Sequence, residues 1–160
     1  MCMTTNNSDE DIVQARFEDA ATILELQKLA YRSEAAIYDD YSIAPLTQTL
    51  QNLQSEFDTK TFLKAVIGDR IFGSVRGYQL NHTCYVERLI VHPDFQRRGM
   101  GTKLLKRIEE IFPTAYRFEL FTGHRSESNI RLYSKLGYRI FKREPMTERL
   151  TFVYMEKRSP

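Results

Sequence analysis

The segment that most restricts the fold is VERLIVHPDFQRRGMGTKLLKRIEEI, at positions 86–111. It begins as an apolar strand, passes through a turn with two arginines and two glycines, and continues as an amphipathic helix. Leu104, Ile108 and Ile111 form an apolar stripe along this helix, opposite its basic residues, and Pro113 ends it. A strand, a helix and then another strand predict a parallel crossover.

The other apolar patterns predict a mixed α+β fold. Period-two segments separated by turns such as Gly68-Asp69 indicate strands and a β-hairpin. Segments with a period near 3.6 indicate helices, for which Asp19 and Thr47 are suitable N-caps. The predicted strands cover 12–17, 62–67, 70–79, 83–91, 116–121, 138–142 and 150–156, and the predicted helices cover 20–36, 48–57, 99–112 and 128–136. We therefore expect a central twisted mixed sheet of about seven strands flanked by about four helices.

Length and composition favour one globular domain over residues 1–160, with residues 1–10 flexible. A net charge of +2 does not by itself indicate a nucleic-acid or membrane partner. No apolar run approaches the roughly 20 residues of a membrane span, and the polar N-terminus does not resemble a signal peptide. Cys2 and Cys84 are expected to be reduced thiols. These features predict a cytoplasmic protein.

The turn at 96–101, QRRGMG, combines features that suit an anion. The first N–H groups of a helix are unpaired, and glycine lets the backbone approach a phosphate closely. Arg97 and Arg98 add positive charge. A capped helix with two solvated arginines fits the same spacing. A P-loop does not, because Thr102-Lys103 reverses its last two residues, and the dinucleotide fingerprint does not fit a unit in mid-chain.

Two segments together resemble one enzyme family. VERLIVHPDFQRRGMG, at 86–101, is similar to the strand and the Q/R-x-x-G-x-G/A turn of the GNAT superfamily of N-acetyltransferases. SNIRLYSKLGY, at 128–138, is similar to that family's Asn-x-x-x-Tyr-x-x-x-Gly-Phe/Tyr segment. The order of predicted elements also matches from about residue 12 to 157, so the resemblance covers nearly the whole chain.

The resemblance implies an acetyltransferase that uses acetyl-coenzyme A (acetyl-CoA). The backbone amides of the turn would hold the pyrophosphate, the strand at 89–91 would pair with the pantetheine arm, and an amide near Leu89 or Ile90 would serve as the oxyanion donor. Asn129 would hydrogen-bond pantetheine, and Tyr133 would protonate the departing thiolate. The implied cofactor-binding residues are Leu89, Ile90, Val91, Gln96, Arg97, Arg98, Gly99, Met100, Gly101, Thr102, Asn129 and Tyr133.

The chemistry of this assignment is reasonable at reference pKa values. Proton transfer from a phenol to a thiolate is uphill by about 2 kcal/mol, which a concerted transfer can offset. The acceptor amine must also lose a proton, and Glu87 is the candidate base, because strict alternation places it on the same face as Tyr85 and Leu89. A water chain, His92 or His124 are alternatives. Tyr133 also fits a packing role, and Glu87 fits an ion pair.

The acceptor side is less specific in the sequence. The family resemblance places it at the first two helices and their connecting loop, where Tyr31, Tyr38 and Asp40 join Glu87 as candidate acceptor-binding residues. Aromatic and acidic residues suit a cationic amine, although a solvated loop has a similar composition. The acceptor is left open between a small amine, an aminoglycoside-like compound, an amino acid and a protein amine. A homodimer is possible.

Two other functions fit parts of the sequence. One is a CoA-binding module without catalysis, and the other is a nucleotide or nucleic-acid binder that uses Arg97 and Arg98. The near-neutral charge and the lack of a basic stripe argue against the second function. No metal is expected, because the three histidines and two cysteines have no ligand spacing.

Overall fold

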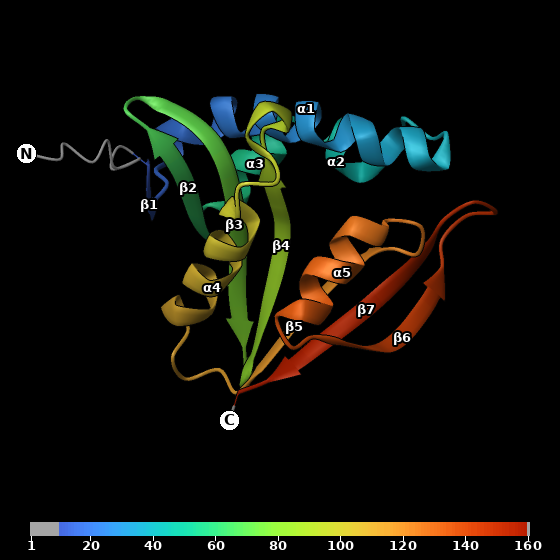
Figure 1. Cartoon of the computed structure of the whole chain (residues 1–160). Helices are drawn as coiled ribbons and strands as arrows, with labels where there is room; N and C mark the ends of the chain where they lie inside the picture. The colour runs from blue at the N-terminus through green and yellow to red at the C-terminus, as the bar shows by residue number, and fades with distance from the viewer. Residues whose placement is uncertain (1–9, 160) are drawn as a thin grey trace, which may run out of the picture.

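The fold is built on one seven-stranded mixed sheet (Figure 1), which confirms the predicted class. The computed structural model describes residues 10–159. The strands lie in the order β1-β2-β3-β4-β5-β7-β6. Their bounds are β1 Glu10–Gln14, β2 Thr61–Ile67, β3 Arg70–Leu80, β4 Thr83–Val91, β5 Arg117–Gly123, β6 Arg139–Pro145 and β7 Thr151–Arg158. Two predictions concern residues outside the described range: flexibility of residues 1–9 and a reduced thiol at Cys2.

Five α-helices within the described residues cover the sheet. They are α1 Ala20–Tyr38, α2 Ala44–Thr47, α3 Leu50–Glu56, α4 Met100–Ile111 and α5 Glu127–Lys135, with short 3-10 turns at Phe17–Asp19 and Pro93–Phe95. Helices α4 and α5 lie in front of the sheet in Figure 1, and α1 and α3 lie behind it. The main core lies between the sheet and α4, whose Leu104, Leu105 and Ile108 are fully buried. None of the described helices is long and apolar enough to cross a membrane.

The first four strands pair antiparallel in sequence order, and β2, β3 and β4 form a meander. The hairpin between β2 and β3 turns at Gly68, as predicted, and this glycine has a left-handed φ of +57°. On the rear face, α1 and α3 cover this meander through a second cluster that includes Ile23, Leu53 and Phe62. This half of the sheet is therefore covered on both faces.

Strands β4 and β5 join the two halves of the sheet at one end only. They are parallel, as predicted, but pair only from Thr83↔Arg117 to Tyr85↔Glu119. Beyond Tyr85 they diverge, and Figure 1 shows the wedge that opens between them. β5 instead continues to pair with β7 as far as Gly123↔Phe152. The wedge therefore arises because β5 pairs with β7 and no longer with β4.

The helix predicted over 48–57 is found as the shorter α3, but the prediction that Thr47 caps it is wrong, because Thr47 ends a separate short helix. A short helix, α2, starts at Ala44, because Pro45 is tolerated in a first turn that needs no N–H donor. The next helix, α3, is capped by Thr49, whose hydroxyl accepts from the amide of Asn52 at 3.1 Å. The other predicted boundaries differ by a few residues. For example, α1 continues to Tyr38, and residues 15–17 leave the predicted first strand.

Candidate functional site

The turn at the start of α4 presents a row of unpaired backbone donors. Gly99 and Arg97 are left-handed, with φ of +82° and +66°, so the chain curls before the helix begins at Met100. The N–H groups of residues 96–102 have no acceptor within the described part of the chain. A Cβ at Gly99 would have no heavy atom within 4 Å, so the space in front of the turn is open. Open space and unpaired N–H groups at a helix start fit a pyrophosphate.

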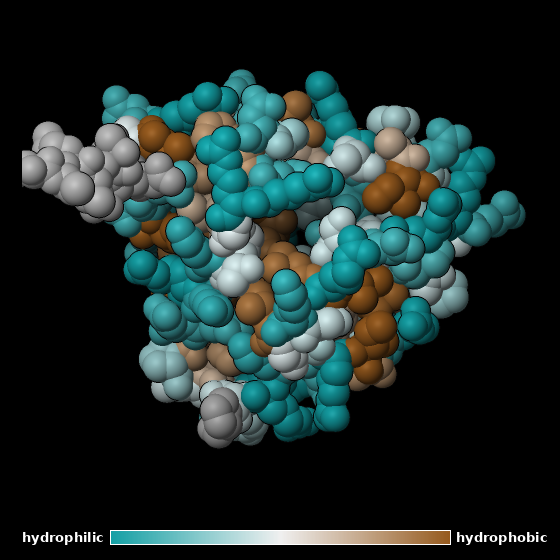
Figure 2. All heavy atoms as spheres, viewed as in Figure 1, coloured by the Kyte–Doolittle hydropathy of each residue, from teal (hydrophilic) through white to brown (hydrophobic). Residues whose placement is uncertain are grey.

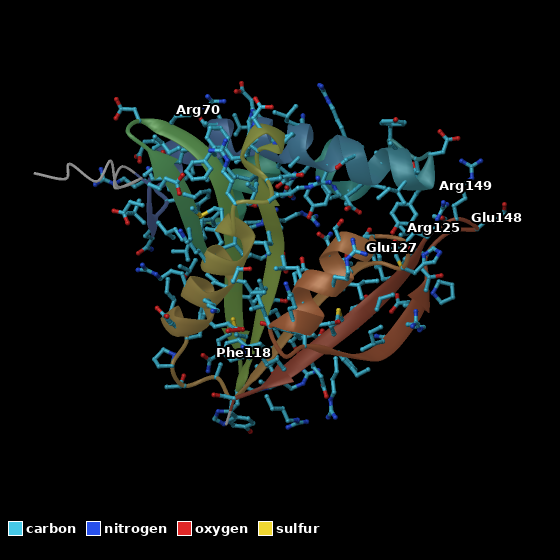
Figure 3. The ribbon with its side chains drawn as sticks, viewed as in Figure 1. Arg70, Phe118, Arg125, Glu127, Glu148 and Arg149 are labelled. Atoms are coloured by element: carbon cyan, nitrogen blue, oxygen red, sulfur yellow. The ribbon has the colours of Figure 1, made fainter. Side chains whose placement is uncertain are left out.

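Two arginines flank this turn by stacking on one ring. The guanidinium carbons of Arg70 and Arg98 lie 5.1 and 5.2 Å from the centroid of Phe95. Arg70 comes from the end of the β2–β3 hairpin, as Figure 3 shows, so a residue distant in the sequence adds charge here. Arg70 was not predicted as a site residue, because only the hairpin geometry brings it to the turn.

A β-bulge interrupts β4 between the turn and the narrow end of the wedge. Ser74 pairs with Ile90 and Arg76 with Glu87, so β4 holds one extra residue there. Arg88 absorbs it with a φ of +53°. The prediction that Glu87 and Leu89 share a face is therefore wrong, because the extra residue breaks strict alternation. Leu89 packs against the core on the α4 side, whereas Glu87 faces the side of α1 and α3.

A pocket lies at the narrow end of the wedge, which we call the wedge pocket. It is lined by Tyr78, Tyr85, Val86, Glu87, Glu119, Leu120, Phe121 and Tyr154. Four aromatic rings and two carboxylates therefore meet where the pairing of β4 with β5 stops. Only Glu87 was predicted as a site residue, because the place where β4 and β5 diverge and the pairing of β7 with β5 decide which side chains meet here, and the sequence shows neither.

The carboxylate of Glu87 is part of a charge network under α3. Lys60 Nζ lies 2.8 Å from Glu87 Oε2, contacts Glu56 and sits 5.4 Å from the centroid of Tyr78. Glu56 also pairs with Arg76 at 3.1 Å, and Arg76 is only 2% exposed. Glu87 thus forms an ion pair with a lysine, one of the two roles that the sequence left open. Its side chain is 22% exposed, and within the described residues Oε1 has no partner.

Tyr133 lies on α5 and belongs to the main hydrophobic core, with its ring centroid 6.2 Å from that of Tyr138, so it has the packing role that the sequence also allowed. It is 6% exposed and its hydroxyl makes no hydrogen bond to another described residue. Burial raises the pKa of Tyr133 well above its usual value, and the nearby Tyr31 and Glu34 raise it further. The phenol therefore keeps its proton throughout the neutral and mildly alkaline range. Figure 2 shows the surface hollowed between β4 and α5, below α1.

Asn129 lies on the same helix and contacts residues of α1 and β5. Its amide group donates to Thr122 Oγ1 at 3.2 Å and to Glu34 Oε1 at 3.4 Å. Ser126, which is buried, donates to the other carboxylate oxygen of Glu34. The Oδ1 atom of Asn129 has no partner among residues 10–159, so a bound group can still donate to it.

The three predicted acceptor residues on the α1 side have different surroundings. Tyr31 is half-buried beneath the Arg88 guanidinium, whose carbon lies 5.9 Å from its ring centroid. Tyr38 is only 3% exposed, and its hydroxyl hydrogen-bonds Ser126 at 2.8 Å. Asp40 accepts from the amide and hydroxyl of Ser42 in its own loop. Tyr31 is near enough to Tyr133 to influence its pKa, and acceptor binding by Tyr31, Tyr38 and Asp40 stays a prediction.

The two histidines considered as bases are both engaged by backbone. His92 Nδ1 accepts from the amide of Asp94 at 3.1 Å, and His124 Nδ1 accepts from that of Thr151 at 3.0 Å. Neither lines the wedge pocket. The described residues contain no group of three or more histidine, cysteine, aspartate or glutamate side chains arranged for a metal ion.

Known sequences resemble this chain in the same region. The family model described as the acetyltransferase (GNAT) family matches residues 21–138. An acetyltransferase of Pectobacterium atrosepticum is 34% identical over 51% of this chain and 59% of its own length. The catalytic subunit of the N-terminal acetyltransferase B complex of Arabidopsis thaliana is 32% identical over 46% of this chain and 44% of its own. The chain thus spans about half the length of such curated relatives.

Solved structures show the same fold. The PaiA N-acetyltransferase of Thermoplasma acidophilum, determined with coenzyme A, has a TM-score of 0.78 at 18% identity and covers 93% of this chain and 98% of its own. The ribosomal-protein-S18-alanine N-acetyltransferase of Escherichia coli has a TM-score of 0.77 at 15% identity, covering 94% and 95%. The family model matches most of the sequence, including β4, the turn and α5. The chain therefore belongs to the GNAT family of acetyltransferases.

Proposed function

We propose that the protein is an acetyl-CoA-dependent N-acetyltransferase that passes the acetyl group directly to a primary amine in a ternary complex. The observation that carries this proposal is the wedge, which has the unpaired amides of the turn at its wide end and the wedge pocket at its narrow end. An extended chain can lie along β4 from one to the other, because β5 leaves that edge of β4 unpaired.

Each residue then has a defined task. The N–H groups of residues 96–102 hold the pyrophosphate, with Arg70, Arg97 and Arg98 adding charge around it. The exposed edge of β4 at residues 89–91 pairs with pantetheine, and an amide near Leu89 or Ile90 donates to the developing oxyanion. Asn129 Oδ1 accepts from the pantetheine arm. Acetyl-CoA, when bound, supplies the thioester from which the acetyl group is transferred.

Two side chains transfer protons in this proposal, one as a base and one as an acid. Glu87 accepts a proton from the incoming amine, directly or through water, using the Oε1 atom that Lys60 leaves free. Tyr133 donates a proton to the departing sulfur. Its raised pKa makes this donation more uphill than at reference values, so we expect the proton to move as the carbon–sulfur bond breaks and not before.

The first test is thermal stability with acetyl-CoA, coenzyme A or ATP. We expect both CoA species to raise the melting temperature and ATP to have little effect; the absence of a shift with acetyl-CoA would rule out the proposal. A thiol-release assay with a panel of primary amines is the second test. Binding of acetyl-CoA without turnover on any amine would instead indicate a non-catalytic CoA-binding module.

A further inference from the structure

Arg88 carries a positive charge that the rest of the site does not neutralise. It stands at the bulge in β4, and its guanidinium stacks on the ring of Tyr31 at 5.9 Å. Among residues 10–159 no carboxylate lies within 4.0 Å of it, and its Nε is buried without an acceptor. A half-buried arginine normally has an anionic partner, since removing the charge from water is costly.

The neighbouring charges are already paired. Arg76 is held by Glu56, and Lys60 by Glu56 and Glu87. Burial, and with it the nearby Arg88, lowers the pKa of Arg76 to about 10, so Arg88 adds to positive charge instead of balancing negative charge. Glu34, the acidic residue of α1 near this point, is engaged by Ser126 and Asn129. Arg88 is therefore left without a counter-charge.

The position of Arg88 separates it from the phosphate end of the site. It lies on the side of the sheet that α1 covers, three residues before Val91, whereas the unpaired amides and their own arginines follow Val91. It also directly precedes Leu89, whose amide is proposed to face the reacting carbonyl. An anion at Arg88 is thus expected on the acceptor molecule and close to its reacting amine.

From this arrangement we infer that the acceptor is a primary amine that also carries a carboxylate, with the carboxylate bound by Arg88. The terminal nitrogens of a guanidinium can hold a carboxylate bidentately, and the guanidinium carbon of Arg88 lies over the Tyr31 ring, 5.9 Å from its centroid. Glu87, the next residue along the strand, offers Oε1 to the amine. Opposite charges on adjacent residues therefore match an amino acid. This inference rests on the proposed acetyl transfer.

Matched substrate pairs test the inference without any mutation. Amino acids with α-, β- and γ-amino groups are compared with their own carboxamides in the thiol-release assay at saturating acetyl-CoA. We expect at least one acid to exceed its amide in kcat/KM by about 10- to 100-fold, the usual cost of losing a charge-assisted contact. Equal rates for every pair, or a preference for amides or diamines, would overturn the inference.

Replacement of Arg88 locates the effect. In R88Q the KM for the preferred amino acid should rise by about 10- to 100-fold while the KM for acetyl-CoA stays unchanged, and the preference for acid over amide should disappear. R88K should retain part of the preference. The matched control is R32A, which removes an exposed arginine next to Tyr31. A rise in the KM for acetyl-CoA alone, or an unchanged acid preference in R88Q, would overturn the inference.

The two proposals fail in different ways. If no amine of any kind is acetylated, the proposed function fails. If amines are acetylated but carboxylates give no advantage, only the role of Arg88 fails. If R88Q does not fold, the wild-type protein with coenzyme A bound provides another test. Its melting temperature is measured with each amino acid and with the matching amide. A larger shift with the acid supports the inference, and equal shifts count against it.

Discussion

The two ends of the wedge are built in different ways. The wide end is a continuous turn at 96–102 that offers backbone N–H groups. The narrow end, the wedge pocket, is assembled from side chains of β3, β4, β5 and β7. Backbone donors bind the same group whatever side chains surround them, whereas side chains select a particular partner. The difference implies that the wide end fixes the cofactor class and the narrow end fixes the acceptor.

The largest expected effect separates these roles at Glu87. In E87Q we expect kcat to fall by about 10²- to 10⁴-fold, because the amide cannot take the proton of the amine. The Kd for acetyl-CoA should stay within about twofold, since Glu87 lies away from the turn. Steady-state kinetics and calorimetric titration measure the two quantities.

The control for this variant is E119Q, which alters the other carboxylate of the wedge pocket, one already paired with Arg117 at 2.9 Å. It should retain most of kcat. If E87Q keeps full kcat and loses acetyl-CoA binding, the assignment of the two ends is reversed.

The next effect concerns the contact that holds α1 against β5. A Cβ at Gly123 would lie 1.9 Å from Tyr38 Oη, closer than any real contact. G123A should therefore reduce the free energy of unfolding by about 3 kcal/mol, as overpacking in a tight core does. Denaturant unfolding measures this loss of stability, which we expect without a direct effect on catalysis.

A double-mutant cycle sharpens this test. Removing the Tyr38 ring makes room for the new methyl group, so G123A/Y38A should be about as stable as Y38A alone. Additive losses in the double mutant would mean that Gly123 is required for its backbone conformation and not for its lack of a side chain.

A smaller effect is expected at the wide end. Gly99 has a φ of +82°, where a branched side chain is strained. G99V should weaken acetyl-CoA by about 10-fold, corresponding to about 1–2 kcal/mol of backbone strain, and leave the acceptor KM unchanged. G68V places the same strain in the β2–β3 hairpin and should not affect acetyl-CoA binding. An equal loss in both variants would indicate general destabilisation.

The smallest effect concerns the pH dependence of kcat, which deprotonation of Tyr133 should not lower at alkaline pH. Burial raises the pKa of this phenol, so its protonated form, which is the form able to donate, persists above pH 10. We expect kcat to show no fall between neutral pH and pH 10. A loss of kcat near pH 9 that Y133F abolishes would contradict this assignment.

The sequence predicted the wide end of the wedge better than the narrow end. The strand, turn and helix at 86–111 and the parallel pairing of β4 with β5 were predicted because the signal is local. The bulge at Arg88 was missed, since nothing in an arginine indicates a left-handed φ. Tyr154 was missed as a pocket residue because the place of β7 beside β5 was not predicted. Glu119 and Phe121 were missed because the point where β5 leaves β4 determines that they face Glu87. Local periodicity predicts elements, but tertiary pairing determines which side chains meet.

The most direct test of acetyl transfer in the wedge is the comparison of Y133F with wild type in kcat and in the Kd for acetyl-CoA. The matched control is Y138F, which alters a buried tyrosine 6.2 Å away by ring centroid whose hydroxyl donates to Glu109. The account predicts that Y133F lowers kcat by about 10²-fold with an unchanged Kd, whereas Y138F retains kcat. Full kcat in Y133F would contradict it.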